Sequence, residues 1–265
     1  MTTIYKWLAL HPVKEDIGIE IEAEFTCPLP MLEIPFWGIT EDHSLRGYSA
    51  EFVTKTPIKI ENVDKTLNVL KQTLKSCGVQ VLDSFRAGVH IHVNCQDLTL
   101  NQVGNFAAVY YCLERMLTKF CGPTREGNFF CLRLKDAEAP LFHLILALQK
   151  NNPHPLNTDN LRYSALNFRS LFKHGSLEFR AMATRPDFSR ISEWAKILYA
   201  LKEYAVTLEK RPRIAEDISF LGPEMWARQV LGDQYFALLK YENCEKDIMS
   251  SMRNVQELIY LKNGE

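Results

Sequence analysis

The sequence of 265 residues predicts an α+β fold, in which helices flank a mixed or mostly antiparallel sheet. Three observations support this prediction. Segments that alternate apolar and polar residues are separated by segments with helical periodicity over most of the chain. The last two alternating segments follow each other directly, which indicates a hairpin, and from Ser189 onward the sequence is helical to its end.

The strand segments have the period of two that places successive side chains on opposite faces of a sheet. In DIGIEIEAEF the odd-numbered positions from Ile17 to Phe25 are apolar. Glycine and proline punctuate the loop-rich residues 26–48, and Pro57 ends the next strand. We predict strands over residues 16–25, 49–57, 87–95, 162–172 and 175–184, with a hairpin turn at Lys173, His174 and Gly175 between the last two.

The helical segments show apolar residues three or four positions apart. The first has a stripe formed by Val63, Leu67, Leu70 and Leu74 and stops near Gly78. We predict helices over residues 62–78, 99–122 and 139–151, followed by a helical tail with breaks near Pro212 and Gly222.

Composition narrows the class of protein. Hydrophobic residues make up 46% of the chain and the net charge is −1, which gives no charge-based indication of nucleic-acid binding. The seven cysteines form no CxxC pair, which favours reduced thiols in a cytoplasm. There is no apolar signal core and no apolar run long enough for a bilayer, so we predict a cytoplasmic protein without a membrane segment.

The polar face of the predicted strands carries an unusual set of residues. In the first strand three glutamates stand at every second position, although like charges on one face repel each other. The other strands add imidazole, carboxylate, amide and guanidinium groups in the same alternating register. The set comprises Glu20, Glu22, Glu24, Glu51, His90, His92, Asn94, Glu178 and Arg180.

A water-exposed sheet face is the simpler explanation for any one of these strands. Lys and Thr, the usual residues of such a face, are however missing from these positions. Several carboxylates and an arginine suit a nucleoside triphosphate bound through Mg²⁺, or through Mn²⁺ where histidine is a ligand. The sequence contains neither GxxxxGK[ST] nor GxGxxG, so ATP would have to bind on the sheet face through metal ions.

Four motifs occur in a characteristic order: GIEIE, then W…EDHSL…AEFVTKTP, then GVHIHVN, then RYSALNF…GSLEFR. In this order, over residues 16 to about 205, the chain resembles the amidoligase family. These are carboxylate–amine ligases of the glutamine synthetase superfamily, which also includes the glutamate–cysteine ligases.

The resemblance implies a glutamine synthetase-like fold, with a curved antiparallel sheet whose concave face forms the site. It also implies an ATP- and Mg²⁺-dependent reaction in which a carboxylate is phosphorylated and an amine then displaces the phosphate. The implied metal ligands are Glu20, Glu22, Glu51, His90 and Glu178. Arg180 and Glu178 are the implied catalytic residues, and the implied nucleotide or substrate contacts are His92, Arg180, Arg162, Asn167 and Arg169.

The same resemblance implies a catalytic domain over residues 1–205. The helical sequence that follows lies outside the resemblance, and we predict that residues 206–265 form a helical extension packed on this domain. Three roles stay open for the extension: it caps the domain, shapes the amine site or forms a homo-oligomer. The role of Asp42 also stays open. The expected substrates are small-molecule or peptide carboxylates and amines, and such ligases are found in bacteria and phages.

Three other functions compete with a ligase. A guanidino kinase-like phosphotransferase would use the same phosphate chemistry but release a phosphorylated acceptor. A non-catalytic metal-binding protein would be expected to have lost ligands, and none of the matched positions is lost. A zinc hydrolase is disfavoured because the sequence has no HExxH and its many carboxylates suit a harder metal.

Overall fold

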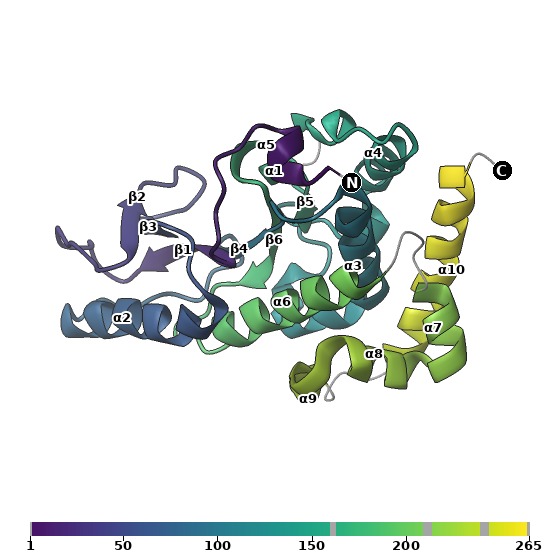
Figure 1. The fold of residues 1–265 in the computed structure, drawn as a ribbon. Coiled ribbons are helices and arrows are strands. Elements are labelled where there is room, and N and C mark those ends of the chain that lie inside the picture. Colours follow the sequence, from purple (N-terminus) through teal and green to yellow (C-terminus); the bar gives the residue numbers. More distant parts are fainter. Residues whose placement is uncertain (1, 160–162, 209–213, 239–243, 264–265) are drawn as a thin grey trace.

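The computed structural model describes residues 2–159, 163–208, 214–238 and 244–263. Its centre is an open six-stranded sheet in the order β2-β3-β1-β4-β6-β5 (Figure 1). All neighbouring strands in this sheet are antiparallel, which confirms the α+β class and the antiparallel preference. The strands are β1 (Ile17–Phe25), β2 (Trp37–Thr40), β3 (Tyr48–Thr54), β4 (Gly88–Asn94), β5 (Leu166–Asn167) and β6 (Ser176–Ala183).

The two faces of the sheet differ as the alternation predicts. Ile19 on β1, Ile91 on β4 and Phe179 on β6 are fully buried on the apolar face. This face is covered by α2 (Val63–Ser76), α3 (Leu100–Cys121) and α6 (Ile191–Thr207), and Figure 1 shows α2 and α6 running along it. The charged side chains therefore lie on the opposite face.

The ladder between β4 and β6 is irregular beside His90. Val89 lies opposite Met182 and Ile91 opposite Phe179, so that two steps along β4 face three steps along β6. This is a β-bulge, a feature that re-aims side chains next to functional sites. Simple alternation predicts that Ala181 follows Phe179 on the apolar face of β6. The residue opposite Val89, an apolar residue of β4, is Met182 instead, so the alternation fails after Arg180.

The prediction of a strand over residues 162–172 is wrong for most of its length. Residues 160–162 lie outside the described part of the chain, and β5 contains only Leu166 and Asn167. The Asn167 side chain then accepts a hydrogen bond from the Arg169 N–H at 3.0 Å and turns the chain into α5 (Ser170–His174). β5 and β6 are antiparallel neighbours, but this short helix connects them instead of the predicted hairpin turn.

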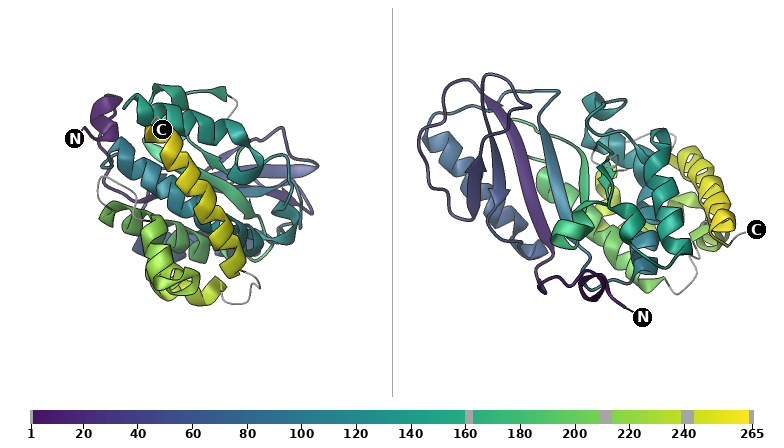
Figure 2. Two further views of the ribbon diagram at one scale, coloured as in Figure 1. Left: turned by 90° about the vertical axis from the view of Figure 1, so that its right-hand side faces the viewer. Right: turned by 90° about the horizontal axis from the view of Figure 1, so that it is seen from above.

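The C-terminal helices form a separate group against α3 and α6, at the end of the molecule away from β2 (Figures 1 and 2). The predicted break at Gly222 is confirmed, with φ of 76° at this glycine, whereas Pro212 lies outside the described residues. Asn254 donates a hydrogen bond to the Tyr111 hydroxyl of α3 at 2.9 Å. The group consists of α7 (Ile214–Leu221), α8 (Pro223–Leu231), α9 (Tyr235–Leu238) and α10 (Cys244–Asn263).

Two further helices lie outside these layers, α1 (Ile4–Trp7) and α4 (Glu138–Gln149). In the described part of the chain, no helix combines the length and the apolar character that crossing a bilayer requires.

Candidate active site

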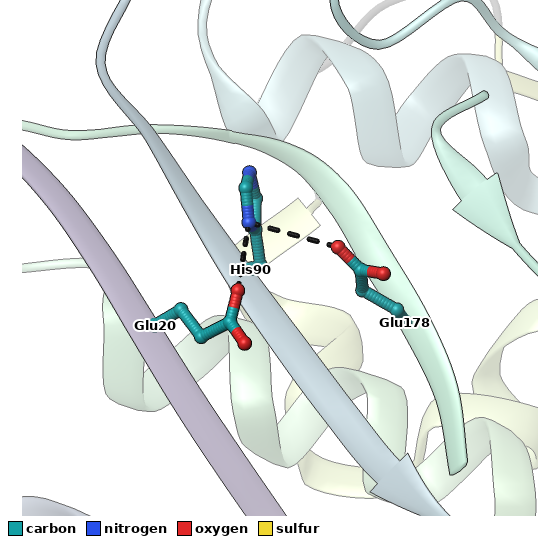
Figure 3. Close-up of side chains that lie close together, drawn as sticks. All are labelled: Glu20, His90 and Glu178. Atoms are coloured by element: carbon teal, nitrogen blue, oxygen red, sulfur yellow. Dashed lines mark hydrogen bonds and ion pairs between the residues drawn. The ribbon is translucent and has the colours of Figure 1, made fainter. Parts of the chain in front are cut away.

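His90 stands at the centre of the charged face, between β1 and β6 (Figure 3). Its Nδ1 lies 3.1 Å from Glu20 Oε2 and 3.6 Å from Glu178 Oε1. Its Nε2 lies 3.5 Å from Glu22 Oε1. Three strands thus bring three carboxylates to one imidazole, which is the expected consequence of their common strand face.

These side chains form two groups that could each hold a metal ion. One group is Glu20, His90 and Glu178, and the other is Glu22, Glu51 and His90. In each group the ligand atoms lie within 4.8 Å of one another. A neutral imidazole offers one lone pair, so His90 can ligate an ion in only one group at a time. The carboxylate-rich set suits a hard divalent cation.

Burial, hydrogen bonds and neighbouring charges shift the pKa values of the glutamates in this cluster. Burial raises the pKa of Glu20, but hydrogen bonds from His90 and His92 outweigh burial and hold this pKa far below its usual range. Burial likewise raises the pKa of Glu178, but the nearby charges of Arg180, His90 and His92 together outweigh burial and lower this pKa. Burial and the nearby charge of Glu20 raise the pKa of Glu51.

His92 connects the cluster to α5 through hydrogen bonds. Its Nε2 lies 3.1 Å from Glu20 Oε1 and its Nδ1 lies 3.0 Å from Ser170 Oγ. Because an ionised carboxylate only accepts hydrogen bonds, Nε2 carries the proton and donates to Glu20. Glu20 is therefore held from both sides, by His90 through one oxygen and by His92 through the other.

Two cavities open on this face and share Glu20. The larger cavity, of about 470 Å³, lies toward the Asn94 end of β4. Its wall includes Leu10, Val13, Ile17, Val53, Pro57, Lys55, Lys173, His92 and Asn94. The smaller cavity, of about 360 Å³, is strongly polar and lies toward the Gly88 end of β4. Its wall includes Glu20, Glu22, Glu51, His90, Glu41, Asp42, Arg86, Arg125, Arg180, Phe130 and Tyr163.

A family model described as "Putative amidoligase enzyme" matches residues 40–201, which is more than half of the chain. The chain belongs to the amidoligase family. The match begins at Thr40, so it contains Glu51, His90, Glu178 and Arg180 but not β1 with its glutamates. No curated protein matches the chain. Membership of this family implies an amide-forming ligase that acts on small-molecule substrates.

In this amidoligase, Arg180 and Asn167 both hold Glu178. Arg180 Nη1 donates a short hydrogen bond to Glu178 Oε1, and Asn167 Nδ2 donates to Glu178 Oε2 at 2.7 Å. Glu178 is thus fixed through both oxygens. The expected contact of Asn167 with nucleotide or substrate stays a prediction, and its amide nitrogen donates to a carboxylate of the cluster.

Two other arginines, Arg169 and Arg162, were expected to contact nucleotide or substrate. Arg169 forms an ion pair with Asp159, its side chain is about half exposed, and it lines neither of the two cavities. Arg162 lies outside the described residues.

Three weaker candidates, two on strands and one in a loop, have local structural partners. The Glu24 carboxylate accepts the Arg46 N–H at 2.9 Å. Asn94 donates to the carbonyl oxygens of Val13 and Glu15 and so fixes the segment before β1. Asp42 accepts the Ser44 N–H at 2.8 Å in a turn that forms part of the wall of the smaller cavity.

Sequence reasoning missed two arginines of the amidoligase site. Arg86 comes from the loop before β4, and Arg125 from the turn that follows α3. Neither residue stands on a strand, so the alternation that revealed the other charged groups could not reveal these. The glycine and proline of the CGPTREG segment mark it as a loop, but no local pattern indicates that it folds back onto the sheet.

Gly88 is required by the close packing of this site. A Cβ at this position would lie 3.0 Å from Arg125 Nη2 and 3.3 Å from Glu22 Oε2. We expect Gly88→Ala to displace these two charged groups and to lower ligase turnover by about tenfold or more, since a misplacement of about 1 Å can reduce rates 10²-fold.

Gly38→Ala in β2 is the matched control for this experiment. A Cβ there would meet only the Val53 carbonyl oxygen, at an ordinary contact distance of 3.6 Å. Steady-state kinetics and thermal melting of both variants provide the comparison. Equal turnover by the two variants would contradict the requirement for glycine at position 88.

Proposed function

We propose that this amidoligase is an ATP- and Mg²⁺-dependent carboxylate–amine ligase with a glutamine synthetase-like fold, which forms an amide through an acyl phosphate. The observation that carries the proposal is the convergence of Glu20, Glu22, Glu51 and Glu178 on His90, next to Arg180. Family membership supports the same reaction class.

The ligand set fits a divalent cation. Glu20, His90 and Glu178 would hold one ion, and Glu22 with Glu51 would hold a second, with Mn²⁺ as an alternative to Mg²⁺. Bound Mg²⁺ would supply electrostatic stabilisation of the phosphate charges. The low pKa of Glu20 keeps this ligand ionised at neutral pH, and Asn167 and Arg180 keep Glu178 in place.

The larger cavity is suited to the nucleoside part of ATP. Its volume of about 470 Å³ falls within the range of about 300–1,000 Å³ that is typical of small-molecule sites. Apolar side chains line much of it, and two lysines, Lys55 and Lys173, lie in its wall together with histidines. Because this cavity and the smaller one share Glu20, a nucleoside bound here would place its phosphates at the carboxylate cluster.

The proposed reaction has two steps. An oxygen of the substrate carboxylate attacks the γ-phosphorus of ATP, and the bond to ADP breaks. The amine then attacks the acyl carbon, inorganic phosphate leaves, and the nitrogen gives up a proton. Arg180 would stabilise the negative charge on the phosphoryl group during its transfer, since a guanidinium can donate two parallel hydrogen bonds to its oxygens.

Isothermal titration calorimetry tests the nucleotide and metal parts of this proposal. We expect ATP to bind in the presence of Mg²⁺ and to bind much more weakly in EDTA, because the carboxylates repel phosphate unless a cation lies between them. Equal affinity in both conditions would contradict metal-bridged binding.

Release of ADP across a matrix of acids and amines, with mass spectrometry of the products, tests the reaction. An amide together with free phosphate supports the ligase. A phosphorylated acceptor would instead identify a phosphotransferase, and an absence of ADP with every pair would favour a non-catalytic protein.

A further inference from the structure

The opening of the smaller cavity is lined by two aromatic residues. Phe130 and Tyr163 both belong to the wall of this cavity, although they are 38% and 48% exposed. They come from segments that pair with each other, because the Leu132 N–H donates to the Tyr163 carbonyl oxygen at 2.9 Å and the Ala165 N–H donates to the Leu132 carbonyl oxygen at 2.7 Å. Backbone pairing between segments that are distant in the sequence therefore brings both rings to one cavity.

Two further exposed aromatic residues continue this surface. Phe129, next to Phe130, is 81% exposed, and Phe85 is 57% exposed. Asn128 donates through Nδ2 to the Phe85 carbonyl oxygen at 3.2 Å, so the loop before β4 meets the loop that carries Phe129. Single exposed rings are ordinary on a protein surface, but four that gather beside one cavity indicate a binding surface. We call Phe85, Phe129, Phe130 and Tyr163 the aromatic rim.

The loop of residues 126–130 is fixed at both of its ends. Before it, the Arg125 Nε donates to the Ala181 carbonyl oxygen at 3.1 Å, which ties the chain to β6. After it, the buried carboxylate of Glu114 on α3 accepts the Leu134 N–H at 2.7 Å. Because the sheet and α3 hold the two ends, the fold itself places this aromatic loop at the cavity.

The interior of the same cavity is charged, which indicates how a substrate would lie in it. Glu22, Glu51 and Arg180 are in its wall, and charged groups buried against an apolar molecule would lose the partners they need. A substrate would therefore place its reacting group among the charged residues, and the rest of the molecule would extend to the opening. There it would meet the aromatic rim, which stabilises an apolar ring through burial and ring contacts.

We propose that the substrate of the smaller cavity carries an aromatic or similarly sized apolar group that packs on the aromatic rim, with Phe130 as its main contact. This inference rests on the proposed function, in which the nucleoside takes the larger cavity. The rim is continuous with the wall of the candidate active site, so the molecule that covers it is the substrate itself. The apolar group can belong to the amine or to the acid, and the two arms of the test distinguish these sources.

Ligand-observed NMR titration of the full chain in Mg²⁺ buffer tests the proposal with two pairs of probes. Benzylamine and methylamine form the amine arm, and phenylacetate and acetate form the acid arm, so that the members of each pair have the same charge and differ by a phenyl ring. We expect the phenyl-bearing probe to bind about tenfold or more tightly than its counterpart in at least one arm, as for a ring that leaves water. The arm with the larger preference identifies the substrate that carries the ring.

Phe130→Ala is expected to reduce this preference to within about threefold, and Phe130→Tyr should restore most of it because the ring is retained. Phe129→Ala changes the most exposed residue of the rim and provides a second variant in case Phe130→Ala does not fold, with a smaller expected loss. Phe236→Ala is the matched control, because Phe236 on α9 is 67% exposed and lines neither cavity. It should keep the full preference of the wild type.

Three results would overturn the proposal: equal binding of the two probes in each arm by the wild type, a phenyl preference that is unchanged in every folded rim variant, or weaker binding of Mg²⁺–ATP by Phe130→Ala with unchanged probe binding. The last result would place the nucleoside, and not a substrate, on the rim. None of these results depends on amide formation. Failure of every acid–amine pair to form an amide, despite Phe130-dependent binding of a phenyl probe, would instead count against the proposed function alone.

Discussion

Replacement of Arg180 by alanine is expected to lower ligase turnover by about 10²–10³-fold, as for the loss of one preorganised donor to a transition-state charge. Binding of Mg²⁺–ATP should weaken much less, because the charge that Arg180 stabilises moves only during phosphoryl transfer. Arg180→Lys should restore little activity, since lysine lacks the planar fork. The measurement is single-turnover ADP formation with the acid–amine pair that reacts fastest, together with titration of ATP.

Arg180 also forms an ion pair with Glu178, so a purely structural role has to be separated from a catalytic one. A structural role predicts a lower melting temperature and nearly normal turnover per folded molecule. Both quantities are therefore measured on the same sample of Arg180→Ala. Wild-type turnover by the folded fraction would remove Arg180 from the chemistry and with it much of the support for a ligase.

Glu20→Gln is expected to have the second large effect, a loss of turnover of about 10²-fold or more and a loss of the Mg²⁺ dependence of ATP binding. Glu20 belongs to one of the two candidate metal groups and accepts hydrogen bonds from both His90 and His92. Glutamine keeps the size of the side chain but removes its charge, and a neutral amide is a weaker ligand for a hard cation. Calorimetry with Mg²⁺–ATP and steady-state kinetics measure the two effects.

Glu24→Gln is the control for this substitution. Glu24 stands on the same strand and the same face, but its carboxylate accepts the Arg46 N–H and belongs to neither metal group. We expect Glu24→Gln to retain turnover within a few fold and to keep the Mg²⁺ dependence. If the two variants lost activity equally, the charge of the strand rather than a specific ligand would be responsible.

The charged face could be predicted from the sequence because it depends on one local rule. Alternation along β1, β3, β4 and β6 places Glu20, Glu51, His90 and Glu178 on one side, and antiparallel pairing then brings them together. The apolar positions of the same strands predicted the buried face equally well.

The remaining parts of the site depend on contacts that local patterns do not encode. Arg86 and Arg125 reach the smaller cavity from loops, whose paths are set by tertiary packing. The bulge in β6 is likewise a property of the pairing between two strands. The strand predicted over residues 162–172 failed because a single side-chain hydrogen bond, from the Arg169 N–H to Asn167, turned the chain into a helix.

The order of the strands also affects how this protein behaves at high concentration. Both edges of the sheet are short, with four residues in β2 and two in β5, while the nine-residue β1 lies inside. Long exposed edges offer unpaired backbone groups to other chains and promote aggregation. β1, β3 and β4 are paired on both sides, and β6 is paired with β4 on one side and with β5 at Phe179 and Glu178 on the other. Association between molecules would therefore begin at β2 or at the edge that β5 shares with the rest of β6.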